Sequence, residues 1–193
     1  MLSLKESLKI LKETNALIEG HFILSSGLHS PKYVQCAQLL SKPDKSSLII
    51  SSLTKKIEEE FDKIDLILAP AMGGIIIGYE IGRLLKKETI FAERVNGEFV
   101  LRRDFKIPAS SNVLIIEDVI TTGKSSLECS KLVDKAKANI SGYACIIDRS
   151  SGKSVINKKI ISLIELNIPT YKKEQLPKDL TLIKPIKPGS RNI

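Results

Sequence analysis

The stretch "VLIIEDVITTGKSS", residues 113–126, joins an apolar run to two acids and then to a loop of Thr, Gly, Lys and Ser. The apolar run favours a buried β-strand over residues 113–116. The hydroxyl residues after it are typical of a helix start, and we expect a helix over residues 125–138. The stretch therefore predicts a strand, a polar loop and a helix in direct succession.

Two further segments have the same character. They are "DLILAPAMGG" (residues 65–74), which leads into an expected helix over residues 75–86, and "GYACIIDRSSGK" (residues 142–153). Strands that are apolar at consecutive positions and alternate with helices favour a mainly parallel sheet covered on both faces. Ligands of such sheets bind beyond the carboxyl ends of the strands, so the three loops should converge on one crevice. We predict an α/β fold with a twisted, mainly parallel sheet flanked by helices.

The flanking segments complete the expected fold. Apolar residues at helical spacing predict an amphipathic helix from Leu4 to near Gly20, and a second helix is expected over residues 45–61. Asn96-Gly97, between β-type residues, is a strong hairpin signal. We interpret residues 1–193 as one domain: an N-terminal helix and hood to about residue 40, a core over 41–165, and an extended C-terminal extension over 166–193.

Composition narrows the class of protein. The 193 residues are 42% hydrophobic and 27% charged, and the longest apolar run, residues 66–79, is too short for a membrane span. We expect no membrane association and no signal peptide, and three widely spaced cysteines fit a cytoplasmic location. The net charge of +8 is spread over scattered lysines. It favours attraction of anionic metabolites over a nucleic-acid partner.

The loop after residue 116 is interpreted as a phosphate site. It is no Walker P-loop, which would need glycine at Asp118, and "GGIIIG" at 73–78 lacks the dinucleotide-binding spacing. Backbone N–H groups at a helix start, with Thr and Ser hydroxyls, bind a phosphate monoester. Glu117 and Asp118 would repel that phosphate, so they need sugar hydroxyls or Mg²⁺ carried by a second phosphate group. The predicted ligand is a phosphorylated sugar.

Residues 113–126 resemble the signature of the type I phosphoribosyltransferases, which use 5-phosphoribosyl 1-diphosphate. The flanking "GHFILSSGLHSPKYVQCA", "APAMGGIIIGYEIGR" and "FAERVNGEFVLRRDF" are similar to those members of the family that use orotate. The resemblance covers about residues 19–150. It implies the type I phosphoribosyltransferase fold and Mg²⁺-dependent transfer of a phosphoribosyl group to orotate, giving orotidine 5-phosphate and diphosphate in pyrimidine nucleotide synthesis.

The resemblance also implies roles for individual residues. Glu117 and Asp118 would hold the ribose hydroxyls, the loop after them would hold the 5-phosphate, and Thr121 and Arg149 would contact orotate. The loop at 71–74 would take the diphosphate with Mg²⁺, and a basic β-hairpin from the neighbouring subunit of a homodimer would close over it. The implied site residues are Glu117, Asp118, Val119, Ile120, Thr121, Thr122, Gly123, Lys124 and Ser125 for the sugar diphosphate, Gly73 and Gly74 in the diphosphate loop, and Arg94, Arg102 and Arg103 in the hairpin.

The sequence departs from the family pattern at the diphosphate. Many relatives have lysine where this chain has Ser25 and Gly73, and "RRDFKIPASSN" at 102–112 lacks the histidine common in the closing loop. The diphosphate contacts are therefore assigned to the arginines. Two alternatives remain open: a purine phosphoribosyltransferase, whose base pocket needs no carboxylate partner, and a sugar-diphosphate sensor that binds RNA.

Structural interpretations stand beside the functional ones. Arg149 could be a surface arginine, the hairpin arginines could protect a sheet edge, and the glycines at 73–74 could form a tight turn. His21 and His29 are expected to be hydrogen-bonded or surface residues rather than catalysts.

Overall fold

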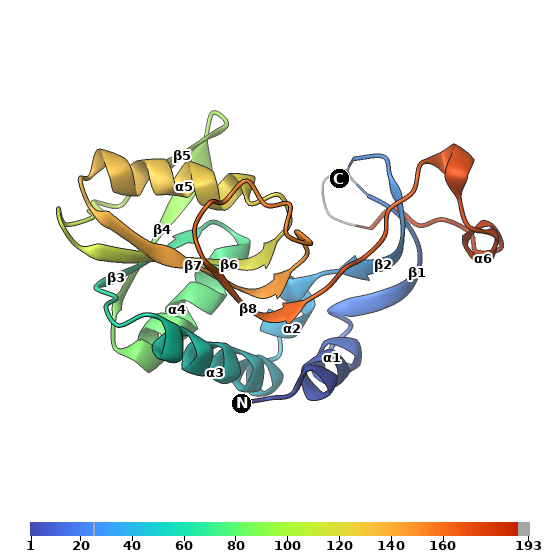
Figure 1. Cartoon of the computed structure of the whole chain (residues 1–193), viewed down its shortest axis with the longest axis horizontal. Coiled ribbons are helices and arrows are strands. Elements are labelled where there is room, and N and C mark those ends of the chain that lie inside the picture. The colour runs from blue at the N-terminus through green and yellow to red at the C-terminus, as the bar shows by residue number, and fades with distance from the viewer. Residues whose placement is uncertain (25, 189–193) are drawn as a thin grey trace.

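The computed structural model describes residues 1–24 and 26–188. Its central sheet has six strands in the order β5-β4-β3-β6-β7-β8 (Figure 1). Every neighbouring pair is parallel except β4 and β5, so the predicted mainly parallel sheet is confirmed. The strands are β3 (Leu66–Pro70), β4 (Glu88–Val95), β5 (Glu98–Leu101), β6 (Asn112–Ile120), β7 (Asn139–Asp148) and β8 (Ile160–Glu165).

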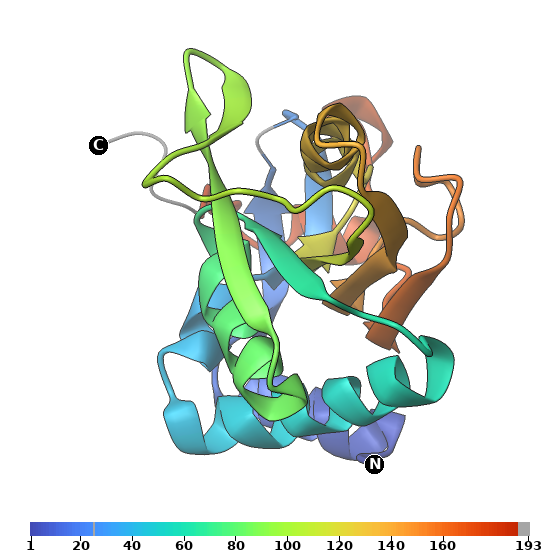
Figure 2. The same ribbon diagram turned by 90° about the vertical axis from the view of Figure 1, so that its left-hand side faces the viewer.

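Helices cover both faces of this sheet. On one face lie α1 (Leu4–Glu13), α3 (Pro43–Glu60) and α4 (Gly73–Leu85), and on the other lies α5 (Lys124–Lys135), as Figure 2 shows. Alternate residues of each strand enter opposite cores. In β3, Ile67 packs toward α3 and α4, whereas Leu66 and Leu68 pack on the side of α5.

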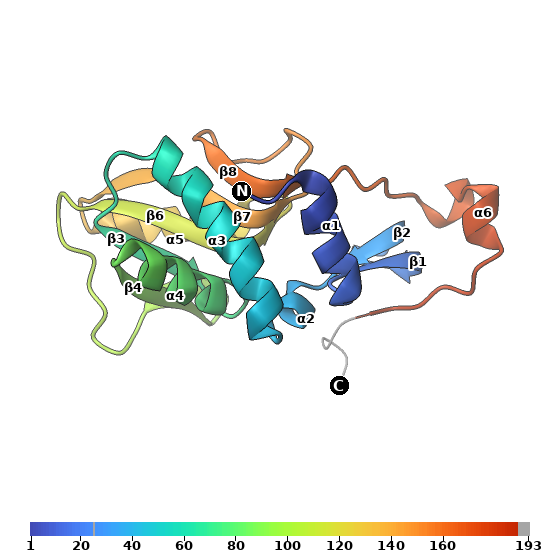
Figure 3. The same ribbon diagram turned by 90° about the horizontal axis from the view of Figure 1, so that it is seen from below.

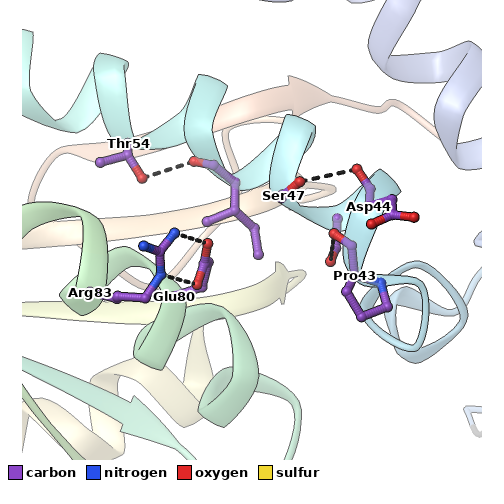
Figure 4. Close-up of polar contacts among 8 residues, drawn as sticks. Pro43, Asp44, Ser47, Thr54, Glu80 and Arg83 are labelled. Atoms are coloured by element: carbon purple, nitrogen blue, oxygen red, sulfur yellow. Dashed lines mark hydrogen bonds and ion pairs between the residues drawn. The ribbon is translucent and has the colours of Figure 1, made fainter.

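Two packed helices, α3 and α4, carry polar groups that are satisfied locally. The buried Thr54 hydroxyl donates to the Ile50 carbonyl of its own helix, and Arg83 forms a two-pronged ion pair with Glu80 within α4 (Figure 4). Bonds of this kind leave the facing apolar residues free to pack. The helices observed agree with those predicted over 45–61 and 75–86 to within two residues at each end.

The first helix is shorter than predicted. It ends at Glu13 rather than near Gly20, because Asn15 adopts a left-handed conformation with φ of 57°. The Ala16 N–H then donates to the Leu11 carbonyl, which closes the helix end. Residues 17–20, which the predicted helix included, instead belong to the strand Leu17–Ile23.

That strand belongs to a small separate sheet. β1 (Leu17–Ile23) pairs antiparallel with β2 (His29–Val34), and we call this pair the hood; a short helix, α2 (Cys36–Leu40), follows it. The C-terminal extension runs past the hood on both edges, with Tyr171 bridged to His29 and Ile186 to Phe22 (Figure 3). Between those contacts lie a 3-10 turn (Lys173–Gln175) and the short α6 (Lys178–Thr181).

Two histidines join the hood to this extension. His21 Nδ1 donates to the Ile183 carbonyl at 2.9 Å, and His21 Nε2 lies 2.6 Å from His29 Nδ1. Both side chains are buried, and the expectation that His21 and His29 are hydrogen-bonded is confirmed. They fasten the extension to the hood.

Several other expectations have clear outcomes. The hairpin at Asn96-Gly97 is present, with positive φ at both residues. The strand predicted over 113–116 continues to Ile120, so the two acids lie on the strand rather than after it; that prediction was wrong. Strand β8 was not predicted at all. Ser25 and residues 189–193 lie outside the described residues. Within the described ranges, no helix combines the length and apolarity that crossing a membrane requires.

Candidate functional site

A polar cavity of about 350 Å³ opens at the carboxyl ends of β3 and β6. It lies where two parallel strands feed neighbouring helices, the usual ligand position in this class of sheet. Two of the three loops predicted to converge contribute to its wall. The lining residues are Ala71, Met72, Gly73, Glu117, Asp118, Val119, Thr121, Thr122, Gly123, Lys124 and Ser125.

The two acids approach the cavity from opposite faces of β6. Glu117 points toward α5, where the Ser126 hydroxyl donates to its Oε2 at 2.9 Å. Asp118 points toward the start of α4, and its Oδ1 accepts a bond from the Val119 N–H. Because successive strand residues alternate in direction, adjacent acids can reach one ligand without sharing one position.

Burial makes both carboxylates costly to ionise. It raises the pKa of Glu117 to about 7, a rise that the Ser126 hydrogen bond opposes and the neighbouring Asp118 charge reinforces. Burial also raises the pKa of Asp118, against the bond from the Val119 N–H. Desolvated acids at a cavity wall suit a ligand that supplies hydroxyl donors, since those bonds favour the charged form.

The loop over residues 121–125 joins β6 directly to the start of α5. Gly123 has φ of 78° and occupies the cap position of α5, where it has no side chain of its own to cap the helix, and the Lys124 N–H donates to Thr122 Oγ1 at 3.3 Å. The positive end of α5 thus faces the cavity, and the N–H groups of the first turn after Lys124 lie where a helix start can bind an anion. A Cβ at Gly123 would come within 2.5 Å of Ser154 Oγ. The loop over residues 154–156 thus requires glycine there and supports the cradle from behind.

The two glycines of the first loop have different surroundings. A Cβ at Gly73 would lie 2.7 Å from Asp118 Oδ1, so Asp118 occupies the space that a side chain at residue 73 would need. A Cβ at Gly74 would meet the Ile116 carbonyl at 2.7 Å, so Gly74 lets α4 approach β6. Gly73 lines the cavity and Gly74 does not.

A backbone hydrogen bond links Arg149 to Ile120, the last residue of β6. Ile120 is buried in the core, and its carbonyl accepts the Arg149 N–H at 2.8 Å. Arg149 lines neither this cavity nor a second one of about 340 Å³ at the ends of β7 and β8. Over residues 1–24 and 26–188, its Nε is the only buried side-chain nitrogen or oxygen without a hydrogen-bond partner. Burial lowers the pKa of this guanidinium, and Tyr33 of the hood faces it.

The hairpin arginines are not brought to the cavity. Arg94 pairs with Glu128 of α5 at 2.6 Å and covers the Phe99 ring. Arg102 and Arg103 both pair with Glu93, at 3.4 and 2.7 Å. Within this chain the three arginines pair with glutamates of β4 and α5, and all three are substantially exposed.

Sequence reasoning missed one contact of the site. Ser126 is fully buried and binds Glu117, yet it follows the signature loop directly and looks like any helix serine. The contact arises because β6 continues through residues 117–120 and directs the Glu117 side chain toward α5, where Ser126 lies.

The chain belongs to the phosphoribosyltransferase family, since the family model described as "Phosphoribosyl transferase domain" matches residues 35–179. Within that family it groups with the orotate phosphoribosyltransferases. It is 46% identical to the orotate phosphoribosyltransferase of Parvibaculum lavamentivorans over 96% of this chain and 97% of the relative. It is 44% identical to the enzyme of that name from Methylorubrum extorquens, over 97% and 96% of the two chains.

Solved structures show the same fold at lower identity. The orotate phosphoribosyltransferase of Aeropyrum pernix has a TM-score of 0.72 at 20% identity, covering 82% of this chain and 92% of that one. The adenine phosphoribosyltransferase of Thermoanaerobacter pseudethanolicus has a TM-score of 0.62 at 21% identity, covering 70% and 88%. The fold is therefore shared by enzymes named for different bases, and the base must be read from the site.

Proposed function

We propose that this chain is an enzyme that transfers the phosphoribosyl group of 5-phosphoribosyl 1-diphosphate to orotate in pyrimidine nucleotide synthesis. N1 of orotate bonds to C1 of the ribose and loses its proton, the bond from C1 to the diphosphate oxygen breaks, its electron pair leaves with the diphosphate, and the N1 proton is released with it. The observation that carries the proposal is one cavity with two carboxylates beside a helix start whose cap position is a glycine. Full-length similarity to orotate phosphoribosyltransferases supports the choice of base.

The sugar phosphate fits the two halves of the cavity. The 5-phosphate would lie at the start of α5, among the N–H groups and hydroxyls of residues 121–125. Glu117 and Asp118 would accept hydrogen bonds from the ribose hydroxyls, and Val119 would line the wall between them. Positive charge develops at C1 as the diphosphate departs, so fixed positions and nearby carboxylates stabilise the transition state more than a strong base would.

Arg149 is proposed to bind the carboxylate of orotate. A partly desolvated guanidinium whose Nε has no hydrogen-bond partner among the described residues is costly, and a planar carboxylate would supply two parallel hydrogen bonds. Thr121, at the mouth of the cavity, would contact the same base. Adenine and other purines lack a carboxylate, so an arginine at this position favours orotate over them.

Mg²⁺ is proposed to enter with the diphosphate. No group of three His, Cys, Asp or Glu side chains among the described residues could hold a metal ion by itself. In many phosphate sites Mg²⁺ binds mainly through the substrate phosphates, and we propose that it does so here. When bound it would neutralise the leaving group, and the backbone of residues 71–74 would position that end of the substrate.

The hairpin is proposed to act across a homodimer. Its arginines would leave their present glutamate partners and reach the diphosphate of the neighbouring subunit, excluding water from the donor. Exposed ion pairs of this type contribute only about 0–1 kcal/mol each, so they would not prevent the movement. We also propose that residues 1–193 form a single domain that works in the cytoplasm, without nucleic-acid or membrane partners.

A double variant tests the sugar assignment. Glu117→Gln with Asp118→Asn keeps the size of both side chains and removes their charge. Apparent affinity for the sugar diphosphate or turnover should fall by about tenfold or more, because hydrogen bonds to charged groups contribute about 1.5–3 kcal/mol. Steady-state kinetics with orotate and Mg²⁺ measure both. Unchanged kinetics in a folded double variant would remove the assignment.

A further inference from the structure

Ser126 lies behind the cavity wall and does not line it. Its side chain is fully buried in the first turn of α5, and its hydroxyl donates to Glu117 Oε2 across the gap between α5 and β6. That bond ties one carboxylate oxygen to the protein, while Glu117 itself lines the cavity. We infer that Ser126 is a positioning residue for the ribose, which orients Glu117 and keeps it able to accept hydroxyl hydrogen bonds. The inference rests on the proposed role of Glu117.

Among the groups around Glu117, Ser126 is the one that stabilises its charged form. Asp118 is its neighbour on β6, Cys129 faces it from α5, and Cys145 lies opposite it on β7. Asp118 repels a second negative charge, and neither thiol carries positive charge. Burial and Asp118 both raise the pKa of Glu117, and the Ser126 hydrogen bond is what opposes them.

A buried serine in a helix can satisfy its hydroxyl by donating to a backbone carbonyl of the same helix. Ser130, one turn further along α5 and also buried, donates to the Leu127 carbonyl of its own helix at 2.7 Å and also hydrogen-bonds the Tyr143 side chain of β7. A bond to a carbonyl of the same helix is the ordinary solution for serine. Ser126 differs because its partner on the neighbouring element is a charged group, and such a hydrogen bond is about twice as strong as one between neutral groups. Ser130 is therefore the matched control for removing a buried hydroxyl from α5.

The test compares the pH dependence of two variants. In Ser126→Ala the KM for 5-phosphoribosyl 1-diphosphate should rise about tenfold at pH 7, because more of Glu117 becomes protonated and its orientation is lost. At pH 9, where Glu117 is ionised in both proteins, the ratio to the parent should shrink to a few-fold. Ser130→Ala should leave the KM unchanged at both pH values. If Ser126→Ala does not fold, Ser126→Cys keeps the size with a weaker donor and takes its place.

A second background separates this inference from the role of Glu117. Adding Ser126→Ala to Glu117→Gln should cause no further pH-dependent change in KM, because the titrating partner is gone. If Glu117→Gln alone leaves the KM unchanged, the proposed ribose contact fails. If Glu117→Gln raises the KM but Ser126→Ala leaves it unchanged, or changes it equally at pH 7 and pH 9, the positioning role of Ser126 is overturned.

Discussion

Replacing Glu117 by Gln should stabilise the ligand-free protein at neutral and alkaline pH, although it damages the site. The carboxyl lies at the end of β6, where burial raises its pKa from an ordinary 4.5 to about 7. In the unfolded chain water surrounds the same group, so it ionises near the ordinary value. The pKa of about 7 in the folded state exceeds the ordinary pKa of 4.5 by about 2.5, so the folded chain binds this proton about 2.5 powers of ten more tightly than the unfolded chain does.

The magnitude and the sign follow from that difference. Each power of ten corresponds to about 1.4 kcal/mol, so an ionised Glu117 costs the fold about 3 kcal/mol. The stability gained from the neutral carboxyl is complete below pH 4.5 and is lost as the pH rises to about 7. Glutamine does not titrate and shows no such loss. The unfolding free energy of Glu117→Gln relative to the parent should therefore increase by about 3 kcal/mol between pH 4.5 and pH 8.

Urea unfolding at several pH values measures this difference directly. Circular dichroism would follow the parent, Glu117→Gln and the control Glu59→Gln, which removes an exposed carboxylate from α3. The predicted result is that the unfolding free energy of Glu117→Gln, relative to that of the parent, rises with pH. For Glu59→Gln this difference should rise less. If this difference does not change with pH, or if the parent becomes the more stable protein as the pH rises, the claim that Glu117 is held desolvated at the cavity is refuted.

Three further predictions concern the other parts of the site. Gly73→Ala should raise the KM for the sugar diphosphate by about tenfold, since the new Cβ would displace the Asp118 carboxylate 2.7 Å away; an unaffected KM would contradict the placement of Asp118. Arg149→Ala should weaken use of orotate by about thirtyfold or more while the sugar diphosphate binds nearly as before, and Arg149→Lys should recover only part of the loss; equal loss for both substrates would make Arg149 something other than the carboxylate contact. Mixing a chain carrying Arg94→Ala, Arg102→Ala and Arg103→Ala with one carrying Glu117→Gln and Asp118→Asn should restore activity through one intact hybrid site, and failure despite confirmed subunit exchange would count against shared sites.

The central sheet could be predicted because its strands are apolar at consecutive positions. A run such as residues 113–116 has few alternatives to a strand buried on both faces, and the following hydroxyl residues mark the helix start. The sequence of residues 121–125 predicts a phosphate site for a similar reason, because hydroxyl and glycine residues at a helix start are neighbours in sequence. These features depend on neighbours in sequence.

The remaining features depend on contacts between distant residues. Nothing in the periodicity around Leu17 indicates that Asn15 ends α1 in a left-handed turn. The hood is held by the C-terminal extension through Ile183 and Ile186, which lie more than 150 residues away. The link between Ser126 and Glu117 needed β6 to continue past residue 116, and the pairing of Arg94 with Glu128 needed the hairpin to meet α5.

The most direct test of the account is a single reaction with purified protein, orotate, 5-phosphoribosyl 1-diphosphate and Mg²⁺. Loss of orotate and release of diphosphate are measured together, with adenine replacing orotate in a parallel reaction. The account predicts one diphosphate released for each orotate consumed, and no consumption of adenine. Consumption of adenine with orotate left intact, or release of diphosphate without loss of either base, would contradict it.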